Sequence, residues 1–407
     1  MRLDQDIFDE DFETSVSEIP GTNEGIEDVE LSTAITDVNA VLSATDWTTE
    51  TIISQINKGN IQLDPKFQRR EAWNADRKSR YIESLILGMP IPQLVLAESK
   101  IKRGAYIVID GKQRLLSIRQ FAADTTDTVF KPLRLTGLGN SAVNGKNLAD
   151  LISDPLLKDE LSTFENQSIR TVVIKGWTNE KFLYQVFLRL NTGSVALSPQ
   201  ELRQALHPGP FLDYTDQRSA DSEALRDLLS SNKPDFRMRD VELLVRYYAF
   251  QNFFARYSGD MKGFLDITCQ TLNTSWPSVE NELRRQGDEF EVAYSATRLI
   301  FDNHPFRRWT GTYYQKPYNR AIFDIMMFFF ANKEIRESAI DNKEAVESAF
   351  KHLCIEDTEF AKSIEVSTKS MNATYARFST WSDVLRRILP IPVPEVNLVE
   401  KRIVVGA

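Results

Sequence analysis

The chain has 407 residues, enough for two or three domains, and its 42% hydrophobic and 26% charged content is typical of a globular protein. This composition excludes collagen-like, fibrous and wholly disordered proteins, and the longest apolar run, 321–331, contains Asp324 and is too short for a membrane helix. The net charge of −9 is unevenly distributed: residues 1–30 hold eleven acids and one base, so residues 31–407 sum to about +1 and stay compatible with nucleic-acid binding.

The N-terminal residues and the small number of cysteines indicate the cellular compartment. The N-terminus begins Met-Arg-Leu-Asp and has no apolar segment of the kind that marks a secretory signal. Cys269 and Cys354 are the only cysteines, too few for a disulfide framework or a zinc knuckle. We therefore expect a cytoplasmic protein that has no membrane partner.

Residues 1–45 are expected to form an acidic, disordered leader, because they combine high charge with few apolar anchors. Such a tail is usually just solvated. An alternative hypothesis is that its carboxylates mimic phosphates and compete for a basic groove in the body of the protein.

The first ordered segment, 46–177, mixes helical and strand patterns and is predicted to be an α+β domain. A helix should begin after a Thr48 cap and a second one after an Asn74 cap, and each is followed by a glycine that suits a helix end. Between the two helices we expect a short strand at 61–63, and the Met-Pro-Ile-Pro segment after the second helix should be extended. The strands predicted beyond it are 93–98, 105–109 and 169–175, and a helix is predicted over 113–123.

From residue 178 the apolar pattern changes to a helical period, so 178–390 is predicted to be an all-helical domain and 391–407 a C-terminal tail. Ser198-Pro-Gln-Glu201 is a capping box with proline at the first helical position, which marks a helix start. Further helices are predicted over 237–257, 260–272, 286–302, 319–332, 343–354 and 374–388.

The strongest candidate site is the sequence Asp110-Gly111-Lys112-Gln113-Arg114, which follows a predicted strand and opens a predicted helix. Free backbone N–H groups at a helix N-terminus bind anions, and Lys112 and Arg114 add positive charge there. Asp110 is a candidate ligand for Mg²⁺ or for a reacting water. The competing interpretation is an ordinary turn that Asp110 caps, flanked by two solvated bases.

A second cluster is the segment 65–80, in which six bases and two acids are interleaved with Phe67 and Trp73. Basic and aromatic side chains together suit contact with phosphates and bases. The candidate nucleic-acid-binding residues are Arg70, Trp73, Arg77, Lys78 and Arg80. Taken alone, the segment could equally be a solvated helix face on which Trp73 is a packing anchor.

The sequence motifs of several other common catalytic and cofactor-binding sites are not present in this chain. His207, His304 and His352 are scattered, and the sequence has no zinc-binding spacing, P-loop, nucleophile elbow or dinucleotide-binding glycine motif. The Asn191-Thr-Gly loop before the capping box is either a helix end or a segment that brings an amide and a hydroxyl over a ligand.

Taken together, these motifs resemble the N-terminal domain of GmrSD-type modification-dependent restriction enzymes, over residues 46–206. The similar segments are Phe67-Gln-Arg with Trp73, Ile82-Glu-Ser-Leu with Gly88-Met-Pro-Ile-Pro, Ile109–Leu115, and Leu190-Asn-Thr-Gly with Leu197-Ser and Glu201-Leu. A further stretch, 239–246 with Tyr257 and Phe264-Leu265, is similar to the helical part of stand-alone members.

The resemblance implies a ParB/sulfiredoxin-like core, an Asp-Gly-Gln-Gln-Arg signature that binds and hydrolyses nucleoside triphosphates, and a role in phage defence for several members. The signature falls on Asp110, Gly111, Gln113 and Arg114, and the family's Gln-Arg element falls on Gln68 and Arg69. In this chain the third signature position is Lys112, which puts the nucleotide preference in doubt. The histidines of the family's HNH nuclease module are also missing from this sequence.

The resulting hypothesis is a nucleotide-binding and nucleotide-hydrolysing, DNA-associated protein of a restriction or defence system, whose cutting activity resides in another polypeptide. Asp110, Gln113 and Arg114 would be catalytic, Asp110 would hold Mg²⁺, and Gly111, Lys112, Gln68, Arg69 and Asn191 would bind the nucleotide. The alternative is a non-enzymatic adaptor that binds DNA or nucleotide and docks a separate nuclease subunit.

Overall fold

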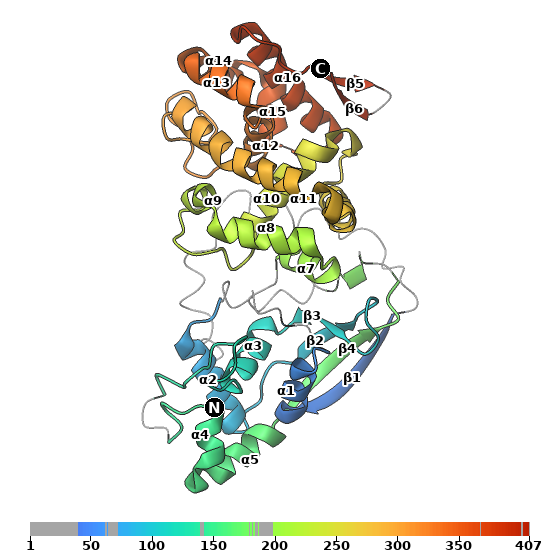
Figure 1. Cartoon of the computed structure of the whole chain (residues 1–407), viewed down its shortest axis with the longest axis vertical. Coiled ribbons are helices and arrows are strands. Elements are labelled where there is room, and N and C mark those ends of the chain that lie inside the picture. The colour runs from blue at the N-terminus through green and yellow to red at the C-terminus, as the bar shows by residue number, and fades with distance from the viewer. Residues whose placement is uncertain are drawn as a thin grey trace. The chain divides into compact units, whose positions relative to one another are not determined.

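The structure is a computed structural model of the chain (Figure 1), and it describes residues 40–61, 63, 72–138, 142–178, 180, 182–183, 186, 198–366, 368–399 and 402–406. The chain forms two compact units. The α/β unit comprises the described residues up to 208 together with 233–239, and the helical unit comprises 209–232 and 240–406. The mixed α+β class and the helical C-terminal region agree with the sequence-based prediction, but the predicted boundary at 177/178 lies inside the α/β unit.

The α/β unit is built on a four-stranded sheet in the order β1-β4-β2-β3. The strands are β1 Val41–Thr48, β2 Leu94–Glu98, β3 Tyr106–Asp110 and β4 Ser168–Lys175. β2 pairs antiparallel with β3 and parallel with β4, and β1 pairs antiparallel with β4 along its whole length. The register between β2 and β3 shifts at Val95/Leu96, next to the end of β3. Such a bulge redirects the side chains beside it.

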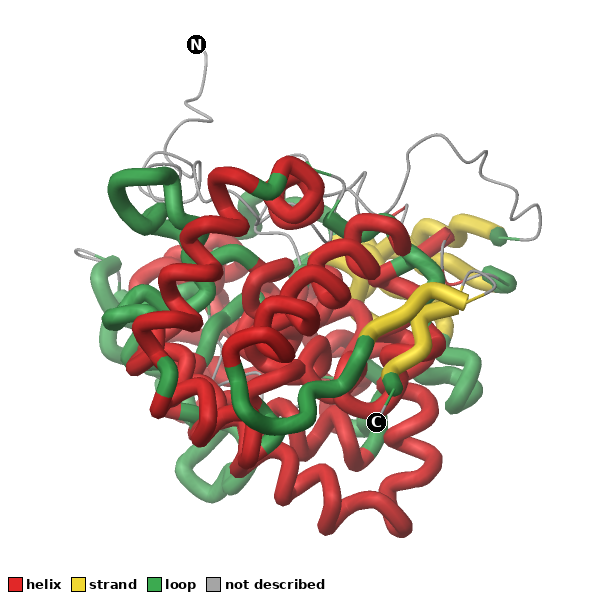
Figure 2. Tube along the Cα trace, turned by 90° about the horizontal axis from the view of Figure 1, so that it is seen from above, coloured by secondary structure: helices red, strands yellow, loops and turns green. Residues whose placement is uncertain are grey.

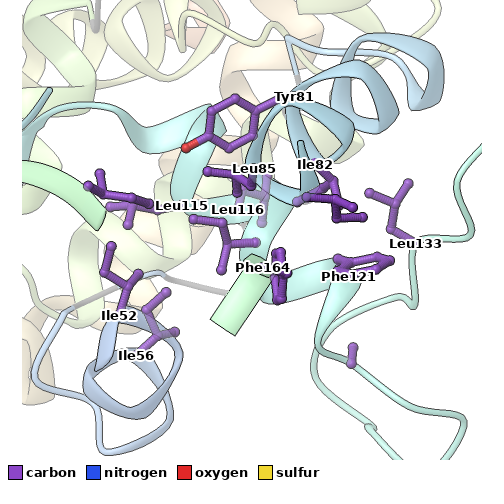
Figure 3. Close-up of a cluster of buried hydrophobic side chains, with 14 of the residues drawn as sticks. Ile52, Ile56, Tyr81, Ile82, Leu85, Leu115, Leu116, Phe121, Leu133 and Phe164 are labelled. Carbon is purple, nitrogen blue, oxygen red and sulfur yellow. The ribbon is translucent and has the colours of Figure 1, made fainter. Parts of the chain in front are cut away.

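Side chains point alternately to the two faces of the sheet along its strands, and both faces are buried. Leu94, Leu96 and Val108 contribute to the core shown in Figure 3, together with apolar residues of α1 Thr49–Asn57, α2 Ala75–Ile86, α3 Lys112–Phe121 and α5 Lys158–Asn166. The intervening residues Val95, Ala97, Ile107 and Ile109 pack on the other face against Leu202 and Leu206 of α7 Pro199–Leu206. Because both faces are covered, the ends of the strands are held rigidly, and the candidate site lies at one of these ends.

The predicted helix starts in this unit are confirmed by their caps. The side chains of Thr48, Asn74 and Ser198 accept hydrogen bonds from backbone N–H groups in the first turns of α1, α2 and α7, respectively. Between α3 and β4, where the sequence pattern was weak, the structure has α4 Leu148–Ser153, the 3₁₀ turn Pro155–Leu157 and α5.

Two predictions about the ends of the chain are wrong. Residues 41–45, assigned to the disordered leader, form part of β1, and residues 391–407, assigned to a tail, contain an antiparallel hairpin of β5 Val396–Val399 and β6 Arg402–Val405. Figure 2 shows this hairpin in yellow close to the C-terminus. Of the predicted strand at 61–63, the structure describes residues 61 and 63, and Ile61 forms an isolated bridge with Tyr106. Residues 1–39 lie outside the described part of the chain.

The helical unit consists of helices, apart from the hairpin at its end. Its helices are α8 Pro210–Asp221, α9 Glu223–Leu228, α10 Arg239–Phe253, α11 Met261–Ile300, α12 Arg320–Phe330, α13 Lys333–Asp341, α14 Lys343–Glu356, α15 Thr358–Glu365 and α16 Met371–Ile388, with a 3₁₀ turn at Phe254–Arg256. The two helices predicted over 260–272 and 286–302 are one continuous helix, α11, which contains Pro277. No helix among the described residues is both long and apolar enough to cross a membrane.

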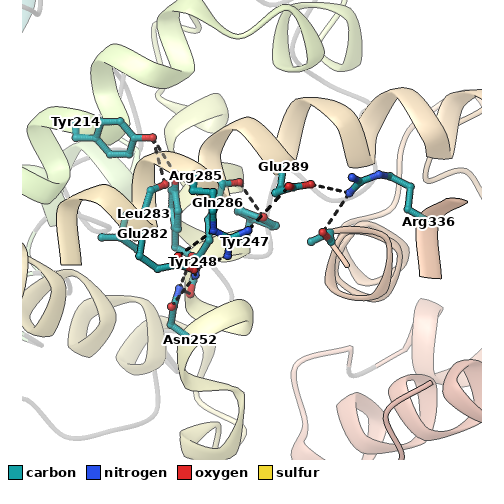
Figure 4. A network of polar contacts seen from close by, with 11 residues as sticks. Tyr214, Tyr247, Tyr248, Asn252, Glu282, Leu283, Arg285, Gln286, Glu289 and Arg336 are labelled. Carbon is teal, nitrogen blue, oxygen red and sulfur yellow. Dashed lines mark hydrogen bonds and ion pairs between the residues drawn. The ribbon is translucent and has the colours of Figure 1, made fainter. Parts of the chain in front are cut away.

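α10 and α11 are joined by hydrogen bonds from side chains to backbone carbonyls (Figure 4). The hydroxyls of Tyr247 and Tyr248 donate to the carbonyls of Gln286 and Leu283 at 2.9 and 2.8 Å. Burial raises the pKa of both tyrosines, so they stay protonated donors. These bonds fix the register of the two helices.

The interior of the helical unit also contains a charged cluster. Arg246 forms a bidentate pair with Asp324 at 2.6 and 2.8 Å, and Arg377 lies 3.5 Å from the same carboxylate. All three side chains are at most 3% exposed. A buried carboxylate shared by two guanidinium groups needs this pairing to offset its desolvation, so we interpret the cluster as structural.

A pH-dependent contribution to stability is expected from Asp127, which follows α3. Its carboxylate accepts the N–H groups of Val129 and Phe130, each at 2.8 Å, and pairs with Arg119 at 2.5 Å. Burial alone would raise its pKa, but these donors outweigh burial and hold the pKa of Asp127 below its ordinary value. A depressed pKa means that the stabilisation is complete above the unfolded-state pKa and is lost as the pH falls through the folded-state pKa.

We therefore predict that Asp127→Asn lowers the free energy of unfolding by about 1–2 kcal/mol at pH 7. The difference from wild type should shrink as the pH is lowered below about 4. Urea denaturation at a series of pH values measures this. Glu165→Gln, at a position with no ion pair among the described residues, is the control, and a pH-independent deficit in Asp127→Asn would contradict the prediction.

Candidate functional site

The sequence Asp110–Arg114 lies where β3 ends and α3 begins, so the predicted arrangement of strand, turn and helix is confirmed. Asp110 is the last residue of β3 and Gly111 is the N-cap of α3. Gly111 has φ 101°, and no side chain caps this helix end within the described residues. The first backbone N–H groups of α3 therefore lack the usual side-chain acceptor.

Glycine is required at position 111 for two reasons. Its positive φ is unfavourable for residues that carry a Cβ atom. A Cβ atom would also lie 2.3 Å from Leu94 Cδ2 and 3.5 Å from Arg114 Cζ. The second distance shows that the Arg114 guanidinium folds back over the turn instead of extending away from the helix.

Arg114 is fixed by two neighbours from the adjoining strand ends. Its Nη2 donates to Asp110 Oδ2 at 2.6 Å and its Nη1 donates to the carbonyl of Gln93 at 2.9 Å, just before β2. The Arg114 side chain is 7% exposed and that of Asp110 is 19% exposed. Because a guanidinium carries five N–H donors, this arrangement orients the group and leaves donors for a further acceptor.

The electrostatics of this turn favour an anion. The N-terminus of α3 carries the positive end of the helix dipole, and its first turn contains no acidic side chain. Arg114 places a further positive charge at the same end, where cations are normally unfavourable, and Asp110 is the acid it pairs with. A phosphate or carboxylate bound at this turn would interact favourably with both the dipole and Arg114.

Lys112 has a different environment from Arg114. Its ammonium lies 2.5 Å from Glu201 Oε1 on α7, and both side chains are 6% exposed. Glu201 Oε2 also accepts the N–H of Ser198 at 2.7 Å, which completes the capping box of α7. The Lys112–Glu201 pair therefore joins the start of α3 to the start of α7. This role of the lysine is structural.

The N-terminal end of α2 lies against the same turn. The N–H of Trp73 donates to Gln113 Oε1 at 3.4 Å, which links the aromatic residue of the basic segment to the signature. The Trp73 ring contacts the ring of Tyr81, at 5.7 Å between centroids, and the Arg77 guanidinium lies 5.0 Å from the Trp73 centroid. The structure thus brings Trp73, Arg77 and Gln113 together.

The remaining candidate residues divide into three groups. Arg80 is exposed on α2, where a partner could reach it. Lys78 is 3% exposed and donates to Gln120 Oε1 at 2.8 Å, so this base does not fit a role in contacting DNA. Gln68, Arg69, Arg70 and Asn191 lie outside the described residues.

Three participants were not identified from the sequence. Glu201 was recognised only as part of a capping box, although it also neutralises Lys112. The Gln93 carbonyl contributes through its backbone, which leaves no signal in residue type. Tyr81 was not predicted from the sequence, because the apolar stripe of α2 is the stronger pattern. Its spacing from Arg77 and Leu85 nevertheless places it on the same helix face as these residues.

Metal binding would depend on Asp110. In the part of the chain that the structure describes, no three His, Cys, Asp or Glu side chains lie close enough together to hold a metal ion. A single carboxylate fits Mg²⁺ only where ligand phosphates and waters supply the other oxygens, as is usual for this ion.

Comparison with known proteins gives one match. Residues 49–208 match the family model described as the GmrSD restriction endonuclease, N-terminal domain. The matched range begins at the first residue of α1, ends just after α7, and contains the whole Asp110–Arg114 turn. Neither the curated proteins nor the solved structures provide a further match.

Gly111→Ala should destabilise the α/β unit by more than the φ angle alone explains. The left-handed angle costs about 1–2 kcal/mol for a residue with a Cβ, and the contact with Leu94 adds to this. Gly104→Ala is the matched control, since Gly104 has φ 77° and nothing within 4 Å of the added Cβ. Free energies of unfolding from urea titrations compare the two variants. Equal losses would show that the turn at 111 can accommodate a side chain.

Proposed function

Residues 49–208 form a GmrSD-type N-terminal domain, and on this basis we propose that the protein binds nucleoside triphosphates as part of a restriction or phage-defence system. The observation that carries the proposal is the Arg114 guanidinium, oriented by Asp110 over the uncapped N-terminus of α3. We also propose a ParB/sulfiredoxin-like core for this domain and a cytoplasmic location for the protein, where both nucleotide and DNA are available.

Each residue of the turn has a distinct role in this proposal. Arg114 and the first N–H groups of α3 would hold the terminal phosphates, because charge-assisted and dipole interactions both favour phosphate there. Gln113, whose Oε1 accepts the Trp73 N–H, would direct its amide NH₂ group to the ligand. Gly111 allows the backbone to approach the phosphates closely.

Asp110 would have three functions. It keeps Arg114 in place through the 2.6 Å bond, and its carboxylate would share a Mg²⁺ ion with the bound triphosphate. Bound Mg²⁺ neutralises phosphate charge and so favours attack of water on the terminal phosphorus. Asp110 would position that water. Gln68, Arg69 and Asn191 complete the proposed site on the strength of the resemblance alone.

Arg114→Gln should weaken triphosphate binding by about 1.5–3 kcal/mol, because it removes a charged donor to phosphate while keeping a polar side chain. Asp110→Asn should retain measurable binding but reduce Mg²⁺-dependent phosphate release by roughly a hundredfold. Isothermal titration calorimetry and a phosphate-release assay measure the two effects. Arg170→Gln is the control, since its side chain is 58% exposed and lies on β4.

The results also separate an enzyme from an adaptor. Wild-type affinity in Arg114→Gln would place the phosphate site elsewhere. Binding by the wild-type protein without phosphate release in Mg²⁺ would identify a nucleotide-binding adaptor that docks a separate nuclease subunit.

We further propose that the exposed start of α2 contacts DNA phosphates, with cutting performed by another polypeptide. Arg80 is exposed on this helix, and Arg77 lies over the Trp73 ring. Arg80→Glu should weaken duplex binding and reduce the dependence of log K on log[salt] by roughly 0.9, as expected for one lost phosphate contact. Lys158→Glu makes the same charge change at an exposed position on α5. Equal salt slopes for the two variants and wild type would show that Arg80 is only a solvated surface residue.

A further inference from the structure

Tyr81 has a buried hydroxyl group that no hydrogen bond explains. The residue is 8% exposed, and its Oη makes no hydrogen bond with any other atom of the described chain. Leaving a buried hydroxyl unpaired costs free energy, so such groups are rare and call for an explanation. Phenylalanine would fill the same space without this cost.

The surroundings of the hydroxyl connect it with the candidate site. The Tyr81 ring packs against Trp73, whose backbone N–H is bonded to Gln113 in the signature. Figure 3 shows Tyr81 at the margin of the apolar cluster, with its hydroxyl directed to the side where Leu115 lies, the residue that follows Arg114. The aromatic ring is thus anchored in the core while the polar end points toward the start of α3.

Electrostatics support this placement. Burial raises the pKa of Tyr81, and the positive charge of Arg114 acts on that pKa in the opposite direction. The hydroxyl therefore lies within the field of the guanidinium and remains protonated at neutral pH. The indole N–H of Trp73 is a second buried donor without an acceptor among the described residues. Two such donors, one of them on the residue whose backbone is bonded to Gln113, suit a ligand that offers acceptor oxygens.

We propose that the Tyr81 hydroxyl donates a hydrogen bond to a phosphate oxygen of the ligand that Arg114 holds. This inference rests on the proposed nucleotide site and adds to it a contact from α2. The hydroxyl is a binding group that favours the phosphate chain over any feature of the base. It keeps its proton throughout.

The test compares Tyr81→Phe with wild type, since this change removes one oxygen and retains the ring. The probes are ATP, GTP and inorganic tripolyphosphate, which has the phosphate chain without sugar or base, each titrated with Mg²⁺. Tyr81→Phe should bind the tripolyphosphate and whichever nucleotide binds wild type roughly tenfold more weakly. Its melting temperature without ligand should equal or exceed that of wild type, because an unsatisfied buried group has been removed.

The control is Tyr106→Phe, the same chemical change in the same unit at a partly exposed tyrosine that packs on Trp47. It should leave all affinities unchanged.

Wild-type affinity in Tyr81→Phe would overturn the inference and leave the proposed function intact, whereas no binding of any probe by wild type would overturn both. Weaker binding of nucleotide alone would move the contact to the sugar or base and overturn the phosphate assignment. A lower melting temperature of ligand-free Tyr81→Phe would show that the hydroxyl stabilises the fold itself, and would overturn it too.

Discussion

The left-handed turn at Gly111 is the constraint on which the arrangement of the site depends. It turns the chain sharply between β3 and α3, so that Arg114, one helical turn later, returns to Asp110 and to the carbonyl before β2. The space beside Gly111 is occupied by Leu94 and by the guanidinium itself. The same turn leaves the helix end uncapped. One backbone conformation therefore both orients the cation and, among the described residues, leaves the helix end without a side-chain cap that would compete with an anion.

The Lys112–Glu201 pair explains how this chain tolerates a lysine where the related signature has glutamine. A lysine that is 6% exposed needs a counter-charge, and Glu201 supplies it while also capping α7. The pair therefore contributes to packing α7 on the sheet, beside the contacts of Leu202 and Leu206. In this arrangement the lysine makes a structural contact between α3 and α7.

Sequence patterns predicted correctly the features that depend only on residues close together in the chain. Thr48, Asn74 and Ser198 cap the helices that their residue types predicted, and the turn at Asp110-Gly111 falls where the strand and helix patterns meet. β1 was missed because its partner is β4, more than a hundred residues away, and its own residues alternate only weakly. α11 is continuous where the sequence predicted two separate helices, 260–272 and 286–302, because tertiary contacts, such as those of Tyr247 and Tyr248, stabilise a helix beyond its local propensity. Within the site, the placement of Asp110 and Arg114 at the turn from strand to helix followed from the motif, whereas their ion pair and the roles of Glu201, Gln93 and Tyr81 depend on which segments meet in space.

The charges at the turn also determine the order in which ligands would bind. Asp110 is already engaged by Arg114, and one carboxylate is a weak ligand set for Mg²⁺, so the free protein has little affinity for the ion at this position. In the proposed function, a triphosphate would bring its own oxygens and help to neutralise Arg114 and the helix end, so that the Asp110 carboxylate could share the metal while it holds Arg114. Nucleotide binding at this turn would then not require Mg²⁺, whereas hydrolysis would. On this proposal the domain would act as a nucleotide sensor without turnover, and as an enzyme only when the metal arrives together with its substrate.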